Sequence, residues 1–435
     1  ASLLAVVLFG FVLGWWRGQT FMAEIQPLQQ LTGQHIVATV QADSDSVYND
    51  RRELVFDASH LHVSDPEDMV LPGRLMVSGF GENAVFKGDV VKIEGKVYAS
   101  RGSRQLRMSY ADLEVLGRSD SQVDTIRRRF AAGMESALPE PQASFGLGLL
   151  IGQRNTLPES VSLALSTVGL THIIAVSGYN LTIIMRSVRR FLYGRSKYQT
   201  TLLSLALMSL FLLMTGFSAS IVRAAIVSGL SLAAWYYGRN IKPLLILALA
   251  AAITAGWSPF YLWTDIGWYL SFMAFFGVLI IAPLICRRLF GADEPKPLTG
   301  IVIESFCALL MTIPFVLYIF SQISLIALPA NLLVVPLVPL AMLLALIAGL
   351  AGMFLPIIST LIALPARILL TYMLDIAELL SRIPNALARR RLELSAMLFL
   401  YACIFVFVLV LRHATEKKHA IITPETNGEK NVRTF

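Results

Sequence analysis

The sequence predicts a polytopic α-helical membrane protein with an inserted, extracytoplasmic β-barrel domain of the small, OB-like type. Of its 435 residues, 55% are hydrophobic and only 15% are charged, which is more apolar surface than a soluble chain of this length can bury. Long apolar stretches fill residues 146–412. Residues 31–118 instead alternate between apolar and polar side chains, which is the pattern of strands.

The chain begins with an apolar run from Ala1 to Trp16, followed by Arg17. Tryptophan and arginine at the end of an apolar helix are typical interfacial anchors, so residues 1–18 are expected to form a transmembrane helix. The run is short, and we expect its start to lie further upstream. A signal peptide is the alternative, but no small-residue cleavage pattern follows the apolar run.

Five or so short strands are predicted between residues 31 and 118. The alternating patterns lie at residues 35–40, 53–56, 74–78, 89–98 and 106–115. Turns rich in Gly and Asp separate them, and Gly95 stands where a barrel strand can bend. This spacing predicts a small barrel of the OB type.

Basic residues and one aromatic residue gather late in this domain. They are Lys92, Lys96, Tyr98, Arg101, Arg104 and Arg107. Such surfaces bind single-stranded DNA through its phosphates and by stacking, at about 1–3 kcal/mol per stacked base. An ordinary solvated edge is the competing interpretation, because residues 31–120 hold ten Lys and Arg against fourteen Asp and Glu.

The same domain contains His60-Leu61-His62-Val63-Ser64-Asp65, which resembles the start of a metallo-hydrolase motif. That motif needs an Asp and a His at the fifth and sixth places so that several ligands converge on two metals. Ser64 and Asp65 stand there instead. We therefore predict a strand with two solvent-facing histidines and no metal site.

Residues 121–145, with Arg127, Arg128 and Arg129, are predicted to be an amphipathic segment that lies along the membrane surface. Beyond it, apolar spans are judged against the ~20 residues needed to cross a bilayer. The candidates are 160–185, 201–217, 221–237, 244–257, 266–285, 301–320, 328–350, 357–380 and 396–411. The span 328–350 is alternatively a re-entrant segment, and residues 413–435 form a polar tail.

The span 160–185 is broken by polar groups at Thr171-His172, Ser177-Gly178 and Asn180. An unpaired polar group costs ~1–3 kcal/mol to bury even after partial compensation, so these groups are expected to face protein or water. We predict an interrupted helix that lines a polar path.

Basic loops predict the orientation. Arg and Lys cluster at residues 186–197, 239–242 and 287–288. If all three loops are cytoplasmic, as the positive-inside rule requires, the β domain lies outside. The clusters at 389–391 and 412–418 flank one span, so the side of the C-terminus stays open.

Three ionisable residues and one amide lie inside or directly beside apolar spans: Arg223, Asp265, Glu304 and Asn331. Such residues are functional candidates, because an Arg at a helix centre costs ~2.5–3.5 kcal/mol on insertion scales. The alternative for Arg223 is a structural pair with Asp265 or Glu304. Asn331 is equally consistent with a pore contact and with a helix cap.

Four blocks over residues 145–340 resemble the ComEC competence family. They read GLLIGQRNTLPESVSLALSTVGLTHIIAVSGYNL, GFSASIVRAAIVSG, TDIGWYLSFMAFFGVL, which includes Ser271, and IPFVLYIFSQISLIALPANLLVVPLVPL. Asn180 stands where the family usually has His, and Gln153 where it has Asp. The C-terminal hydrolase domain of many members does not follow the last span, so a separate nuclease is expected to degrade the strand that is not imported.

The resemblance implies an inner-membrane channel that moves single-stranded DNA into the cytoplasm during natural transformation. The path that it implies includes His172, Ser177, Gly178, Asn180, Arg223, Asp265, Ser271, Glu304 and Asn331. Expected partners are single-stranded DNA, membrane lipid, an outer DNA receptor with its pilus system, and a cytoplasmic helicase or ATPase. The helicase or ATPase is expected because no G-x-x-x-x-G-K-[ST] loop occurs in the chain. No cofactor and no enzymatic activity are expected.

Two other functions compete. Broken helices also suit a secondary transporter of a small solute, but no inverted repeat is evident and an external OB-like domain has no use there. Ser177 with His172 suggests an intramembrane serine hydrolase. The two residues fall on different faces of a regular helix, and Ala175 occupies a place where a hydrolase motif has Gly.

Overall fold

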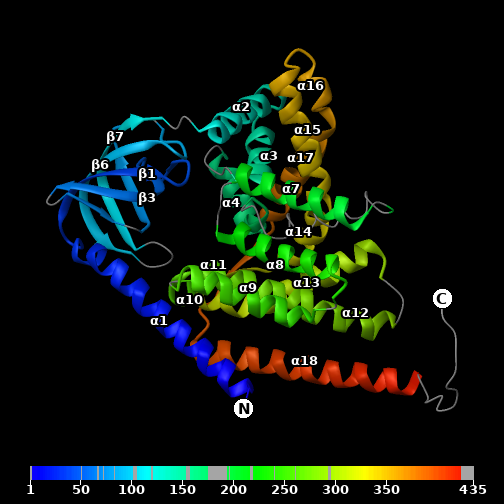
Figure 1. Cartoon of the computed structure of the whole chain (residues 1–435). Coiled ribbons are helices and arrows are strands. Elements are labelled where there is room, and N and C mark those ends of the chain that lie inside the picture. The colour runs from blue at the N-terminus through cyan, green and yellow to red at the C-terminus, as the bar shows by residue number, and fades with distance from the viewer. Residues whose placement is uncertain are drawn as a thin grey trace.

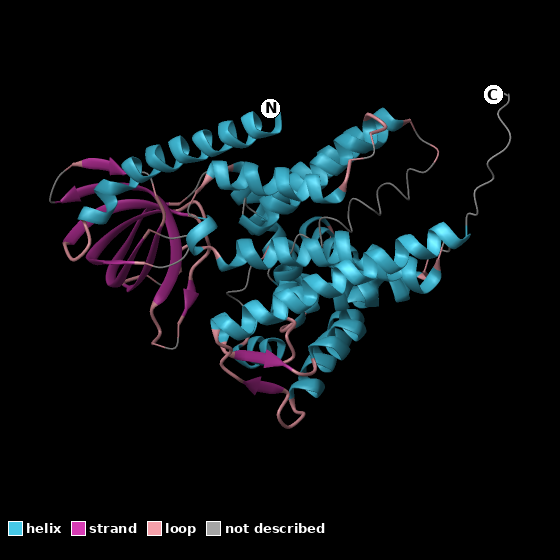
Figure 2. Ribbon diagram, turned by 90° about the horizontal axis from the view of Figure 1, so that it is seen from below, coloured by secondary structure: helices cyan, strands magenta, loops and turns pink. Residues whose placement is uncertain are grey.

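A sheet domain lies beside a larger helical part in this computed structural model (Figures 1 and 2). The structure describes residues 2–49, 51–65, 68–71, 73–82, 84–100, 105–118, 121–152, 157–174, 194, 196–215, 219–239, 241–259, 261–291 and 295–422. Most of these residues are helical, and the sheet lies near the N-terminus, as the sequence predicted.

The sheet domain contains the predicted strands and two shorter ones. The strands are β1 His35–Ala42, β2 Val47–Tyr48, β3 Leu54–Asp65, β4 Met69–Leu71, β5 Leu75–Phe80, β6 Val90–Ala99 and β7 Leu106–Gly117. They form one seven-stranded sheet in the order β1-β6-β7-β5-β3-β2, with β4 beside β3. Strand β1 also pairs with β3, and β5 runs parallel to β7.

Alternation along each strand builds the core of this domain. In β1, Ile36, Ala38 and Val40 are buried while the residues between them are exposed or partly exposed, which is the two-residue period of a strand with one covered face. His60 and His62 are both exposed on β3, so the prediction of a strand with two solvent-facing histidines is confirmed.

The N-terminal helix α1 (Ser2–Gln30) reaches from the sheet domain to the end of α9 (Pro243–Trp257). Arg17 donates from Nε to the carbonyl of Gly256 at 2.9 Å and from Nη2 to that of Trp257 at 3.2 Å. The last carbonyls of a helix lack partners within the helix and attract cations. The residue predicted to anchor α1 at the membrane interface thus also joins it to α9.

The helical part follows the predicted spans closely. Its helices are α2 Gln122–Ala137, α3 Gln142–Ile151, α4 Glu159–Thr167, α5 Thr171–Ile174, α7 Lys197–Thr215, α8 Ala219–Tyr236, α9 Pro243–Trp257, α10 Tyr261–Thr264, α11 Ile266–Phe276, α12 Ala282–Phe290, α13 Pro297–Phe320, α14 Ala327–Val334, α15 Val338–Phe354, α16 Ser359–Ile362, α17 Leu364–Ser381 and α18 Leu394–Ile422. A π-helical turn, Gly277–Ile281, joins α11 to α12, and a 3₁₀ turn, Val335–Leu337, joins α14 to α15. Short strands β8 (Gln322–Ser324) and β9 (Leu387–Arg389) pair with each other.

Among the described residues, four helices are long and apolar enough to cross a membrane. They are Ile266–Phe290, Thr299–Phe320, Ala327–Phe354 and Leu394–His413. Each contains one predicted span. The predicted spans at 201–217, 221–237 and 244–257 correspond to shorter apolar helices.

Two predicted spans are divided differently from the prediction. The span 357–380 is split into α16 and α17 at Ala363, since Pro365 favours the first turn of a new helix. The span 160–185 breaks at Val168–Leu170, between α4 and α5 and before His172. Gly169 has a φ of +76° there, a left-handed conformation that ends helices.

Helix α2 packs its apolar face against α15. Phe130, Gly133 and Met134 are buried in this contact, where a Cβ on Gly133 would stand 2.7 Å from the carbonyl oxygen of Gly349. The sequence predicted that this amphipathic segment lies along the membrane surface. In the structure, protein covers the apolar face of the helix.

A charged cluster joins the sheet domain to α2. Arg127 of α2 lies 3.8 Å from Asp45 of the sheet domain and 3.8 Å from Asp124 of its own helix. The backbone N–H of Lys87 donates to Asp45 at 2.9 Å. Burial lowers the pKa of the Lys87 amine, and the positive charge of Arg127 lowers it further, although Asp43, Asp124 and Asp45 act in the opposite direction.

Candidate functional site

Arg223 is the most deeply buried cation of the helical part that the structure describes. It lies on α8, and only 2% of the residue is exposed. Nη1 lies 3.3 Å from Oδ2 of Asp265, and Nη2 donates to the hydroxyl of Ser271 at 3.0 Å. The structure thus brings together three predicted path residues that are 42 and 48 positions apart.

The start of α11 positions the acceptors for Arg223. Asp265 is the N-cap residue, and its Oδ1 accepts from the backbone N–H of Trp268 at 3.2 Å. Gly267 leaves room for the pair, because a Cβ there would stand 3.1 Å from Asp265 Oδ1 and 3.6 Å from Arg223 Nη2. One carboxylate oxygen therefore caps the helix while the other faces the guanidinium.

Arg223 has N–H donors that its contacts with Asp265 and Ser271 do not use. A guanidinium carries five N–H donors, and the Nε of Arg223 is buried without a hydrogen-bond partner among the described residues. The structural pair with Asp265 that the sequence left open is present. The pair is nearly neutral, so it does not by itself attract a polyanion over a distance.

His172 is a second polar group, and it lies near the point where the α4–α5 turn meets α14. A Cβ on Gly169 would stand 3.0 Å from the Cβ of Ala327 and 3.3 Å from that of Ser324. His172 follows this turn, and its Nδ1 lies 3.0 Å from the carbonyl of Gly169. The structure therefore places the broken span 160–185 beside α14, the helix that carries Asn331.

Asn331 lies inside α14, so the helix-cap interpretation is wrong: the N-cap residue of α14 is Ile326. Only 4% of Asn331 is exposed, and its Oδ1 has no hydrogen-bond partner within the described part of the chain.

Glu304 lies on α13 and is partly buried. Ser177, Gly178 and Asn180 lie outside the described residues.

The predicted basic surface of the sheet domain occupies neighbouring positions on β6 and β7. Lys96 pairs in register with Ser109, and Tyr98 with Arg107. The guanidinium of Arg107 lies 5.6 Å from the centre of the Tyr98 ring, a distance at which a cation and a ring attract. Lys92 lies 3.9 Å from Glu114, whereas Arg101 and Arg104 lie outside the described residues.

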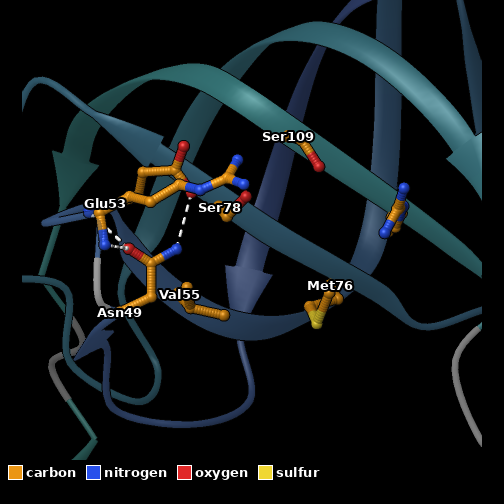
Figure 3. A pocket seen from close by; sticks show the side chains of 8 residues that line it. Asn49, Glu53, Val55, Met76, Ser78 and Ser109 are labelled. Atoms are coloured by element: carbon orange, nitrogen blue, oxygen red, sulfur yellow. Dashed lines mark hydrogen bonds between the residues drawn. The ribbon is translucent and has the colours of Figure 1, made fainter.

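A pocket of about 260 Å³ adjoins this surface (Figure 3). Its lining residues are Asn49, Arg51, Glu53, Val55, Met76, Ser78, Arg107 and Ser109. Sequence reasoning found only Arg107 among them, because the others come from the segment before β3 and from three different strands. The charged triplet Arg51-Arg52-Glu53 at a strand start was the available signal.

Comparison with known proteins identifies the helical part. The model of a family described as competence protein matches residues 149–414. ComE operon protein 3 of Bacillus subtilis (strain 168) is 26% identical over 218 residues, which are 49% of this chain and 27% of that relative. The chain thus matches about a quarter of the relative's length, and no solved structure matches it significantly. Since the family match covers more than half of the chain, this protein belongs to the competence protein family.

Proposed function

We propose that this protein forms a multi-pass channel in the bacterial cytoplasmic membrane and carries single-stranded DNA into the cytoplasm during natural transformation. Family membership supports a role in DNA uptake for competence. The observation that carries the proposal is Arg223, a cation at 2% exposure on an apolar helix. Ionisable residues inside membrane helices face protein or water and mark the routes of charged substrates.

In this proposal, the sheet domain is an OB-like barrel that receives the strand outside the membrane. The pairing of its five long strands supports the barrel: β1 pairs with β3, β3 with β5, β5 with β7, β7 with β6, and β6 with β1. OB-folds bind oligonucleotides on the face of their second and third strands. Strands β3 and β5 have those places here, and they contribute Val55, Met76 and Ser78 to the pocket.

The strand then passes between the helices, along the polar groups around His172, Arg223, Asp265, Ser271, Glu304 and Asn331. An unscreened ion in hydrocarbon costs on the order of 20 kcal/mol, so the route has to be hydrated. Arg223 Nε and Asn331 Oδ1 support this route, because both atoms are buried without partners among the described residues. Arg223 donates hydrogen bonds to passing phosphates. When no strand is present, the carboxylate of Asp265 compensates the positive charge of Arg223.

In this proposal, other proteins act together with this one. Its sequence contains no phosphate-binding loop of an ATPase, so a cytoplasmic helicase or ATPase pulls the strand. A receptor and pilus system delivers DNA outside, and a separate nuclease degrades the complementary strand. The basic loops at residues 186–197, 239–242 and 287–288 lie in the cytoplasm, which leaves the sheet domain outside. Neither a cofactor nor a catalytic residue takes part.

The change Arg223→Gln is expected to lower DNA import in a transformable host that lacks its own copy. The expected loss is roughly tenfold or more, because a hydrogen bond to a charged group contributes about 1.5–3 kcal/mol. Import is measured as labelled DNA that becomes resistant to external DNase. DNA bound at the cell surface is measured in parallel and is expected to stay unchanged.

The matched control is Arg287→Gln, the same substitution at an exposed position near the end of α12. It is expected to leave import unchanged. Both variants are compared at equal amounts of protein in the membrane fraction. Import that survives Arg223→Gln at normal protein levels would exclude Arg223 from the DNA path.

A further inference from the structure

Glu53 carries a buried carboxylate oxygen for which the described residues offer no donor. The residue is 3% exposed. Its Oε2 accepts from Asn49 Nδ2 at 2.7 Å, and its backbone N–H donates to Asn49 Oδ1 at 2.9 Å. Oε1 is buried and has no hydrogen-bond partner among the described residues. Buried polar atoms are nearly always paired, so Oε1 is an acceptor that a donor on a ligand would satisfy.

Glu53 lines the pocket of the sheet domain, and Figure 3 shows it beside Asn49 at one end, with Met76 and Ser109 toward the other. Two cations line the same pocket. Arg51 is exposed and donates from Nη1 to the hydroxyl of Tyr110 at 2.6 Å. Arg107 is exposed as well and lies against Tyr98. A ligand that satisfies all three charges carries both N–H donors and negative charge.

A nucleotide unit has this combination, since its base carries donors and its phosphate is anionic. The pocket volume of about 260 Å³ lies just below the roughly 300–1,000 Å³ of ordinary ligand pockets. It therefore suits one base rather than a larger molecule. Val55 and Met76 supply the apolar part of the lining that the faces of a base require.

The chemistry of Glu53 favours one kind of base. A carboxylate accepts from the N4 amino group of cytosine. Thymine has a carbonyl oxygen at that place, and its single ring N–H lies between two carbonyl oxygens that repel a carboxylate. A cytosine therefore gives Oε1 the donor that it lacks, and a thymine does not.

We propose that this pocket receives a single base of the incoming strand, and that Glu53 selects a base with an exocyclic amino group, cytosine in particular. Arg51 and Arg107 hold the adjoining phosphates. The inference rests on the proposed function, because it assumes that the sheet domain receives DNA. It adds a base preference to a surface that otherwise binds DNA by charge and stacking.

The test uses the full chain in lipid nanodiscs and two fluorescent probes, dC12 and dT12, at two salt concentrations. We expect dC12 to bind about tenfold more tightly than dT12, in line with the discrimination that a good base contact gives. Glu53→Gln is expected to abolish this preference, because the amide oxygen keeps the bond from Asn49 and an NH₂ group, which cannot accept from cytosine, takes the place of Oε1. Glu94→Gln, the same change at an exposed position on β6, is the matched control and should keep the preference.

A second variant keeps the test decisive if Glu53→Gln fails to fold. Ser109→Leu fills the pocket from β7 and is expected to remove the preference for dC12 as well. Equal binding of the two probes by the unaltered protein, or a preference that persists in both variants, would overturn the base pocket while leaving DNA reception intact. Binding of neither probe at low salt would overturn both, whereas the import measurement on Arg223 tests the channel separately.

Discussion

Asp265→Ala is expected to lower the free energy of unfolding by about 3–5 kcal/mol, the usual effect of removing one partner of a buried ion pair. Arg223 is 2% exposed and lies 3.3 Å from Asp265, so the change leaves a buried cation without its counter-charge. The same carboxylate caps α11 through Trp268, and loss of such a cap adds about 1 kcal/mol. The measurement is a denaturant titration in detergent micelles.

Asp265→Asn separates the two contributions. Asparagine keeps an oxygen that accepts from the backbone N–H of Trp268 but carries no charge. We therefore expect Asp265→Asn to be more stable than Asp265→Ala by about the value of the cap and still less stable than the unaltered protein. A stability of Asp265→Ala equal to that of the unaltered protein would contradict the buried pair.

The double change Arg223→Leu with Asp265→Asn tells a structural pair from a DNA contact. Replacing both members of a buried pair by less polar groups is often neutral for stability, so the double variant is expected to recover most of the lost stability. If Arg223 contacts the strand, import stays low in this stable protein. Import that returns with stability would assign the pair a structural role alone.

Gly352→Ala is expected to separate α2 from α15. A Cβ on Gly352 would overlap the carbonyl group of Gly133, and a Cβ on Gly349 would overlap the ring of Phe130. Forcing atoms into a packed contact costs about 1–3 kcal/mol and sometimes more. The expected result is a lower unfolding midpoint, although Ala is intrinsically better than Gly in a helix by about 1 kcal/mol.

Gly14→Ala is the matched control, because a Cβ on Gly14 of α1 would meet nothing within 4 Å. It is expected to leave the midpoint unchanged or to raise it. Protease cleavage between the sheet domain and α2 offers a second readout, because the ion pair of Arg127 with Asp45 joins these two parts of the protein. A stability of Gly352→Ala that equals or exceeds that of the control would show that the helices adapt without strain.

Local patterns in the sequence predicted the elements of this protein well. The strand at 35–40 has a two-residue period that appears as alternating burial in β1, and the spans near 266, 301, 328 and 396 all appear in helices that can cross a membrane. Both signals depend on neighbours along the chain, through side-chain alternation or through length and apolar composition. The sequence predicts the first break of the span 160–185 at Thr171-His172, whereas the structure has it at Val168–Leu170, because Gly169 adopts the left-handed conformation that ends α4.

The sequence by itself determined the class of the protein, the order of its two parts and which charged residues stand among its apolar spans. Only the tertiary structure decided which of those charges meet, since it places Asp265 and Ser271 against Arg223 at the start of α11. It also decided that Glu53, Met76 and Arg107 share one pocket, and that protein covers the apolar face of α2. The reason is physical: periodicity records how a residue faces its own element, whereas a contact between distant elements depends on how their surfaces pack together.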